Sequence, residues 1–383
     1  MAGLPTALRI PLIASIALSA AAYSAGALAE EADTASKLKL SGFVSIVGGK
    51  LVNTSMRDYV GPDSIDGNAC PCYTADWGNA GVYTEKFSFK PESRAGIQGK
   101  YTFSPQFNVV GQVVVRGSDS KPNIQWAYAS YAPNKNWEFQ LGRKRIPLYY
   151  YSDFQDIGAA FPWITVPPEL YGWEATNYNG LSARYRTSVG ETNFSASLFT
   201  GKETVKDSLY MRLYYDSLTK VTWSRLVGGD AEMTRGPLTV RLVYMKTTVR
   251  SINQTEDLDD TARLKAYGIA ANLDFEDWFV LSELTQLTRD FEVGYRVTAP
   301  AATIGAGYRY GAWTPFINYA RYTERTDDLE VYAPQSFRRS SLTLRYDIDA
   351  RSAVKGQIDR TKDVTNNFGG NATVLRLSYD RLF

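Results

Sequence analysis

The charged side chains best placed to act together are grouped around one stretch of the sequence. A basic run, Arg143-Lys144-Arg145, is followed at close spacing by the carboxylates Asp153 and Asp156. Opposite charges held across a narrow wet gap produce a transverse electric field, which orders water and sorts solutes by charge and dipole. Such sorting requires a fold that holds the two sets of charges across a water-filled gap.

Catalysis by the commonest side-chain machinery is excluded by composition. The chain has 383 residues and no histidine. Without imidazole there is no His-based triad, no imidazole metal site and no ordinary general base at neutral pH. We therefore expect no enzyme, no cofactor and no metal site. The formal net charge of +2 also argues against a nucleic-acid partner.

The stretch that carries these charges, Leu141 to Trp173, shows no helical or strand period and contains four prolines. Loops of this length usually carry function or are disordered, and the high aromatic content argues against disorder. We predict a loop packed inside something hollow. Its aromatic run, Tyr149-Tyr150-Tyr151 with Phe154 and Trp163, forms either a stacking track for a flat solute or a wedge against the wall. We favour the wedge.

The flanking chain is a series of roughly ten-residue segments in which apolar and polar residues alternate with period two. Leu375, Leu377 and Tyr379, for example, alternate with Arg376 and Ser378. Short turns such as Tyr310-Gly311 are interleaved with long polar connections, predicted at 52–84, 201–218, 248–261 and 323–337. This pattern is typical of membrane barrels. We predict an all-β fold: a single closed antiparallel transmembrane β-barrel of about 16 strands, with the long loop folded into the lumen.

The two ends of the chain support this class. Residues 1–29 are predicted to be a cleaved secretory signal, with Arg9 at its positive start, an apolar core and Ala27-Leu28-Ala29 as the cleavage pattern. Residues 30–383 then form the barrel domain.

Energetics decide which face of each strand is which. Lys or Arg facing lipid at the bilayer midplane costs roughly 2–4 kcal/mol, so the charged members of each alternation face the lumen. A sixteen-stranded barrel with such an interior encloses an aqueous channel. Basic residues outnumber acids in this inward set, which predicts a weak anion preference; they are Arg94, Arg116, Arg184, Arg186, Arg241, Arg309, Arg345 and Arg376.

The chain resembles the outer-membrane porins of Gram-negative bacteria. The resemblance is carried by Leu141-Gly142-Arg143 feeding a long loop, by Ser93-Arg94-Ala95-Gly96 at a strand start, and by the closing segment 375–383 with its terminal Phe383. It is closest to the sixteen-stranded porins whose third loop folds into the barrel. It implies a location in the outer membrane, a homotrimer, contact with membrane lipid and lipopolysaccharide, and an eyelet between an acidic inner loop and a basic wall.

The residues expected at the pore constriction follow from both arguments. Strict alternation turns Arg143 outward and Lys144 inward, whereas a bulge at Gly142 would re-aim both, and the resemblance places Arg143 at the eyelet. In the alternative interpretation, these charged residues form salt bridges in the barrel wall and have no role in selectivity. The predicted set is Arg94, Arg116, Arg143, Lys144, Arg145, Tyr150, Asp153, Asp156 and Glu169, with Glu174 further along the loop.

The expected function is passive diffusion of small hydrophilic solutes and ions, and the alternative is a channel specific for a sugar or an anion such as phosphate.

Two features outside the constriction complete the prediction. Cys70 and Cys72 are expected to form a disulfide in the first long loop, because the periplasm is oxidising. The acidic run Glu256-Asp257-Leu258-Asp259-Asp260 is interpreted as a solvated loop.

Overall fold

The computed structural model describes residues 37–119 and 121–383, and residues 37–383 form one compact unit. The predicted signal segment, 1–29, lies outside the described residues. None of the helices in the described ranges is long and apolar enough to cross a membrane.

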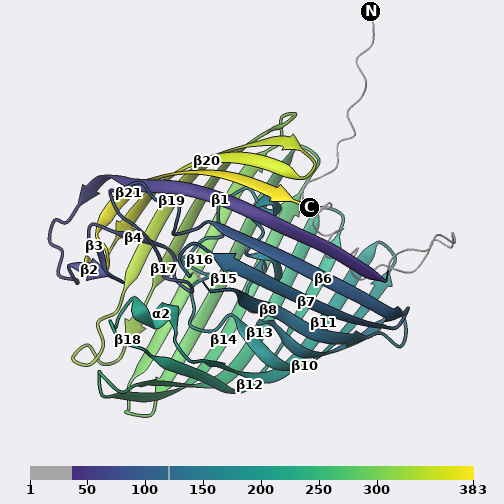
Figure 1. Cartoon of the computed structure of the whole chain (residues 1–383), viewed down its shortest axis with the longest axis horizontal. Helices are drawn as coiled ribbons and strands as arrows, with labels where there is room; N and C mark the ends of the chain where they lie inside the picture. The colour runs from purple at the N-terminus through teal and green to yellow at the C-terminus, as the bar shows by residue number, and fades with distance from the viewer. Residues whose placement is uncertain (1–36, 120) are drawn as a thin grey trace, which may run out of the picture. The chain divides into compact units, whose positions relative to one another are not determined.

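The described chain is a closed antiparallel barrel (Figure 1). Its sheet closes because β1 (Leu38–Ser55) pairs with both β21 (Asn371–Leu382) and β6 (Arg94–Ser104). The terminal Phe383 exchanges two backbone hydrogen bonds with Gly42, at 2.8 and 3.0 Å. A short strand, β18 (Arg325–Thr326), continues β17 past Glu324, so the sheet contains sixteen wall strands and the predicted fold is confirmed. The other wall strands are β7 (Phe107–Arg116), β8 (Asn123–Tyr131), β9 (Trp137–Arg145), β10 (Asn177–Val189), β11 (Thr192–Val205), β12 (Lys220–Arg235), β13 (Leu238–Asn253), β14 (Leu258–Asp274), β15 (Trp278–Phe291), β16 (Arg296–Tyr308), β17 (Trp313–Thr323), β19 (Ser336–Asp349) and β20 (Ser352–Asp363).

The two faces of the wall follow the alternation of the sequence. On β21, Leu375 and Leu377 are exposed on the outside, whereas Arg376 and Asp380 are buried on the inside. The same division repeats on β19, where Leu342 and Leu344 are exposed. Because successive side chains of a strand point to opposite faces, one alternating pattern supplies both the lipid-facing surface and the polar lumen.

One predicted loop is largely strand. The connection expected at 248–261 shrinks to four residues, because β13 runs to Asn253 and β14 begins at Leu258. The added strand ends are held in register by an exposed ion pair in which Arg250 Nη2 lies 2.6 Å from Asp259 Oδ2. Polar composition suggested a loop here, but backbone pairing continues to Asn253 and Leu258 although most of the side chains at these strand ends are polar. The acidic run therefore occupies a tight turn and the first pairs of β14.

The first long connection folds into two small hairpins, β2 (Ser64–Ile65) with β3 (Asn68–Ala69), and β4 (Tyr73–Asp76) with β5 (Gly81–Tyr83). Another connection, between β11 and β12, carries the short helix α2 (Leu209–Arg212). An apolar cluster joins these segments to the loop that precedes β21, and it comprises Ile65, Cys72, Ala80, Val82, Leu213 and Phe368. The long connections thus form a packed layer at one end of the barrel.

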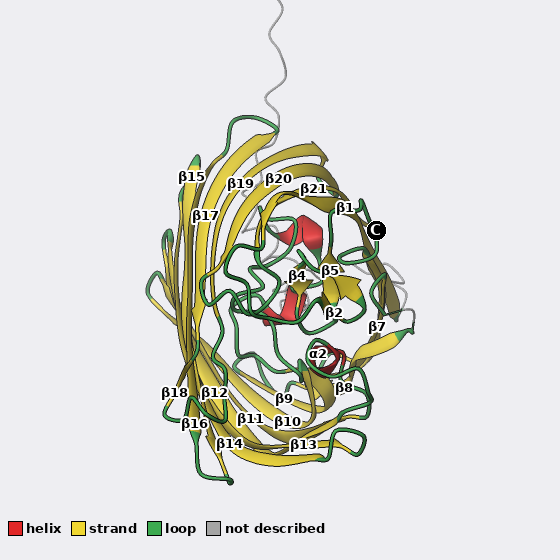
Figure 2. Ribbon diagram, turned by 90° about the vertical axis from the view of Figure 1, so that its left-hand side faces the viewer, coloured by secondary structure: helices red, strands yellow, loops and turns green. Residues whose placement is uncertain are grey.

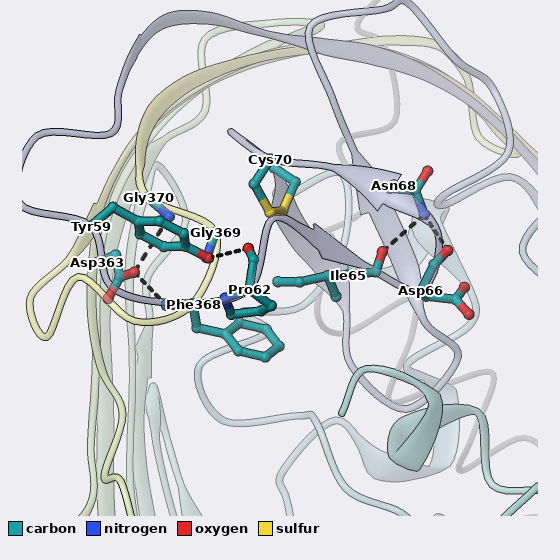
Figure 3. The surroundings of a disulfide bond; sticks show 11 residues. Tyr59, Pro62, Ile65, Asp66, Asn68, Cys70, Asp363, Phe368, Gly369 and Gly370 are labelled. Atoms are coloured by element: carbon teal, nitrogen blue, oxygen red, sulfur yellow. Dashed lines mark hydrogen bonds between the residues drawn. A yellow bond between two sulfur atoms is a disulfide. The ribbon is translucent and has the colours of Figure 1, made fainter. Parts of the chain in front are cut away.

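The sulfurs of Cys70 and Cys72 are bonded to each other in this layer (Figure 3). The surrounding backbone is tied to the last loop: Cys72 N donates to Gly369 O at 3.0 Å, and Gly369 N donates to the Tyr59 hydroxyl at 3.0 Å. The Tyr59 hydroxyl in turn donates to Pro62 O. The first loop is therefore anchored by hydrogen bonds as well as by the disulfide.

Replacing both cysteines by serine is expected to leave the open-channel conductance unchanged. The disulfide encloses a single residue. A cross-link removes less chain entropy from the unfolded state when the closed loop is shorter, so the stability lost is about 2 kcal/mol or less. The checks are single-channel conductance and the unfolding midpoint of the purified protein, with and without reductant. A change in conductance would contradict the assignment of this bond to loop structure alone.

Candidate functional site: the loop inside the barrel

The connection between β9 and β10, residues 146–176, lies inside the ring of strands (Figure 2). It contains two single-turn 3₁₀ helices, η1 (Ser152–Phe154) and η2 (Gly158–Ala160). Its apolar side chains are packed, with Phe161 and Trp163 each only 1% exposed. No regular element spans it, so its position depends on contacts with the wall.

One carboxylate of the loop is surrounded by arginines. Asp156 forms ion pairs with Arg116 of β7, at 2.8 Å, and with Arg145 of β9. Arg94 of β6 donates from Nε to the backbone carbonyl of Asp156 at 2.7 Å. All four side chains are buried. Charge-assisted and bidentate contacts of this kind are the strongest hydrogen bonds in proteins, so they hold the loop against this side of the wall.

A second buried network lies on β19–β21. Glu169 of the loop accepts from Arg339 Nε at 2.9 Å, and Arg339 also contacts Asp359 at 3.0 Å. Arg376 bridges Asp359, at 2.6 Å, to Glu92, at 2.5 Å. Each cation has two carboxylate partners and each contact is desolvated, so removing one member leaves a buried charge without its counter-ion.

The same part of the wall also binds backbone carbonyls of the loop. Lys355 Nζ donates to Gly158 O and Trp163 O, both at 2.6 Å, and forms an ion pair with Asp380 at 3.1 Å. Arg345 Nη1 donates to Ala159 O and Phe161 O, at 2.9 and 3.0 Å. These contacts fix the backbone of η2, which would otherwise carry unsatisfied buried carbonyls.

A third set of contacts lies across the lumen, on β13 and β15. Arg241 donates to Pro147 O and Tyr149 O, both at 2.9 Å. Glu283 accepts from the Tyr171 hydroxyl at 2.5 Å and from Tyr150 N at 2.9 Å. Arg289 pairs with Glu174 at 2.9 Å. The loop is therefore held from several sides of the barrel.

A further group of partly exposed charged lumen residues lies on the remaining side, along β9–β12. Lys144 of β9 and Arg184 of β10 face Asp153 of the loop and Asp230 of β12, with which both interact electrostatically. Glu232, also half-buried, follows on β12. Within the described ranges, Lys144, Arg184, Asp153 and Glu232 form no ion pair, in contrast to the saturated pairs elsewhere in the lumen. Charges of both signs therefore line the open side of the loop.

A family model described as Gram-negative porin matches residues 14–380 of the chain. The chain belongs to the Gram-negative porins. It is a channel of the outer membrane for small solutes. A comparison with curated protein sequences finds no match.

Solved structures share the fold of this porin at low sequence identity. The anion-selective porin from Comamonas acidovorans superposes with a TM-score of 0.58 at 15% identity, covering 90% of this chain and 99% of that one. OmpF of Salmonella typhi, in complex with daunomycin, gives 0.57 at 13% identity, covering 90% and 97%. The trimer form of OmpT from Vibrio cholerae gives 0.56 at 10% identity, covering 90% and 99%. At these identities the likeness concerns the fold alone.

The structure brings together only some of the residues predicted for the constriction of this porin. Arg94, Arg116, Arg145 and Asp156 meet in one buried cluster, whereas Lys144, Asp153 and Tyr150 lie at the partly exposed side. Glu169 and Glu174 point to other strands, toward Arg339 and Arg289. The acids and bases expected at one eyelet are thus distributed over several sides of the loop.

Arg143 is placed differently from the position implied by the resemblance. Its guanidinium contacts Glu203 of β11 at 2.8 Å and Ile124 O at 2.7 Å, and it makes no contact with the loop carboxylates. The pairing of β9 with β10 runs through Gly142 without a shift of register, although Gly142 has a φ of +137°. The strict alternation therefore holds at Arg143 and Lys144, and no bulge re-aims them.

Several residues that hold the loop were missed by sequence reasoning. Arg339 lies on the same inward parity of β19 as Arg345, and a longer alternating register would have included it. Lys355 and Asp359 alternate with the exposed Val354 and Ile358 on β20 in the same way. Glu283 and Arg289 of β15 also follow this rule. The alternation of the sequence indicates that these wall residues face inward, but it does not indicate which loop residues they contact.

The aromatic run mostly fills space between loop and wall. Tyr149, Tyr151 and Trp163 are 6%, 8% and 1% exposed, and Tyr151 packs edge-on against Trp163 at 5.5 Å between ring centroids. Trp163 packs in turn against Phe316 of β17 at 5.1 Å. Tyr150 alone of the three tyrosines keeps intermediate exposure. These contacts match the wedge interpretation.

Proposed function

We propose that this porin is a water-filled channel for passive diffusion of small hydrophilic solutes and ions, narrowed by the loop at residues 146–176. The proposal is supported chiefly by the attachment of that loop to β6, β7, β13, β15 and β19–β21, where Arg376 of β21 donates to the Thr165 hydroxyl at 3.2 Å. A loop held at so many points keeps its position while solutes pass. The free cross-section is then the space between the loop and the wall of β9–β12.

Selection by charge at this place is expected to be weak. The two cations without ion pairs, Lys144 and Arg184, are balanced by two carboxylates without ion pairs, Asp153 and Glu232. Behind them, the cluster of Asp156 combines three arginines with one carboxylate and interacts with Asp76, which leaves one net positive charge. This remaining positive charge favours anions slightly.

A channel specific for a sugar is disfavoured by the burial of the aromatic run. Stacking requires an exposed ring face, and Tyr149, Tyr151 and Trp163 offer almost none. Catalysis has no support either, since the charged lumen residues described above mostly hold the loop in place. We infer that diffusion, rather than a binding step or a reaction, determines transport.

We also propose that the porin works as a homotrimer in contact with membrane lipid and lipopolysaccharide, after removal of residues 1–29. The exposed apolar band, which includes Leu198, Ile317 and Leu377, supports contact with lipid. The trimer form of OmpT supports the assembly. Mass measurement of the purified membrane protein tests both the subunit number and a start at Glu30.

The function is tested by single-channel recording in planar lipid bilayers. We expect conductance that rises in proportion to salt activity for many small ions, and a small reversal potential toward anion preference under a salt gradient. Added sugars should reduce current only through the viscosity of the solution. Saturating block by one solute, or clear cation selectivity, would contradict the proposal.

A further inference from the structure

A row of cations crosses the outer face of the barrel near the end that carries the long loops. Arg321 of β17 lies directly opposite Arg338 of β19, and Arg338 lies directly opposite Lys362 of β20. Arg360 follows in the neighbouring row, opposite Ser340. All four cations are exposed on the parity that faces lipid. Their number on one small patch calls for a partner.

The described chain supplies no anion for this row. Arg321 donates to the Thr323 hydroxyl at 3.2 Å, and within residues 37–119 and 121–383 no ion pair involves any of the four cations. Like charges directly opposite each other on neighbouring strands destabilise a sheet. The row is therefore unfavourable by itself and becomes favourable when a multivalent anion bridges it, which is a task for which guanidinium groups are well suited.

The row of cations continues into an apolar groove. In the same register, Arg321 lies opposite Ala302 of β16, and the row then passes through Leu284 of β15, Ile269 of β14 and Leu242 of β13. These residues line a groove of about 710 Å³, which also includes Pro300 and Arg325. A second groove of about 330 Å³ shares Ile269, Leu284 and Ala302 and extends along the wall to Ile304 and Tyr319.

We propose that this surface is a specific site for a lipid of the outer leaflet that carries several acyl chains and more than one phosphate group. The phosphates bind Arg321, Arg338, Lys362 and Arg360, and an acyl chain lies in the groove over Ala302. A lipid is favoured over a second copy of the chain because the cationic row continues directly into an apolar groove, which matches a phosphorylated headgroup joined to an acyl chain. The inference rests on the outer-membrane location and not on the mode of diffusion, so each can fail without the other.

The test uses the full-length protein in detergent with diphosphorylated lipid A as the probe, followed by native mass spectrometry. The variant Arg321→Gln/Arg338→Gln/Lys362→Gln removes the row. The matched control Lys50→Gln/Lys202→Gln/Lys220→Gln removes the same charge from other exposed strand positions. A third variant, Ala302→Trp, fills the groove and keeps the cations. Heat-modifiable electrophoretic mobility and unchanged conductance establish that each variant is folded.

We expect the row variant to bind lipid A at least about ten-fold more weakly, since each charge-assisted contact contributes more than a factor of ten. Ala302→Trp should weaken binding as well, and the control should bind as the wild type does. Equal binding by row variant and wild type would overturn the proposal, as would equal losses in row variant and control. Wild-type binding of dephosphorylated lipid A or of phosphatidylglycerol at the same affinity would also overturn it.

Discussion

The variant Asp156→Asn is expected to release the loop from the wall of β6, β7 and β9. Asparagine keeps the shape of the side chain but cannot compensate Arg116 and Arg145, which are both buried. Breaking a buried pair by removing one partner costs about 3–5 kcal/mol, because the remaining charge stays uncompensated. With three arginines left around a neutral amide, the loop should leave its position against the wall.

The measurement is single-channel recording, with conductance and open-channel current noise as readouts. Both should increase, because a loosened loop leaves a wider and fluctuating passage. The control is Asp153→Asn on the same loop, whose carboxylate is half-exposed and forms no ion pair in the described ranges. It should shift the reversal potential toward anions and leave the noise unchanged. Quiet, wild-type-like currents from Asp156→Asn would show that the arginine cluster does not hold the loop.

Reversing the two cations without ion pairs at the open side, in Lys144→Glu/Arg184→Glu, is expected to make the channel clearly cation-selective. Asp153 and Glu232 already lie on this side without ion pairs, so the passage would carry their negative charges without Lys144 and Arg184 to balance them. The effect should be large at low salt and small at 1 M, because screening shortens the range of exposed charges from about 10 Å at 0.1 M to about 3 Å at 1 M.

Two further variants make the selectivity result interpretable. Lys144→Gln/Arg184→Gln removes the positive charge without adding repulsion, and it should give an intermediate reversal potential. It also tests the same prediction if the double reversal disturbs folding. Lys202→Glu/Lys220→Glu changes the net charge equally on exposed positions of β11 and β12 outside the described ion pairs, and it should leave the reversal potential near that of the wild type. Selectivity that follows net charge in both pairs would place the selecting groups elsewhere.

Much of the fold could be predicted from residue order because the barrel rule is local. The face of β21 that meets lipid can be predicted from Leu375, Arg376 and Leu377 alone, since neighbours on a strand point to opposite sides. The same rule places Lys144 inward and Arg143 outward, and the structure follows it. Where the resemblance placed Arg143 at the eyelet, local parity was the better guide.

Strand ends were harder to predict, because pairing beyond the membrane does not depend on apolar residues. The segment 248–261 reads as a polar loop, yet Arg250 and Asp259 continue the ladder of β13 and β14. The disulfide partners are an exception among loop features, since Cys70 and Cys72 offer each other as the only cysteines of the chain.

The amino-acid sequence by itself determined the architecture, the face of each strand and the presence of a long inner loop, because period-two patterning and turn chemistry act between neighbouring residues. Only the tertiary structure decided which wall charges the loop carboxylates meet. Glu169 and Arg339 are 170 residues apart, and Arg376 and Glu92 are 284 apart. Such pairs form only when the ring closes and the loop folds into it. The same step therefore determines which charged groups remain without ion pairs on the open side of the loop.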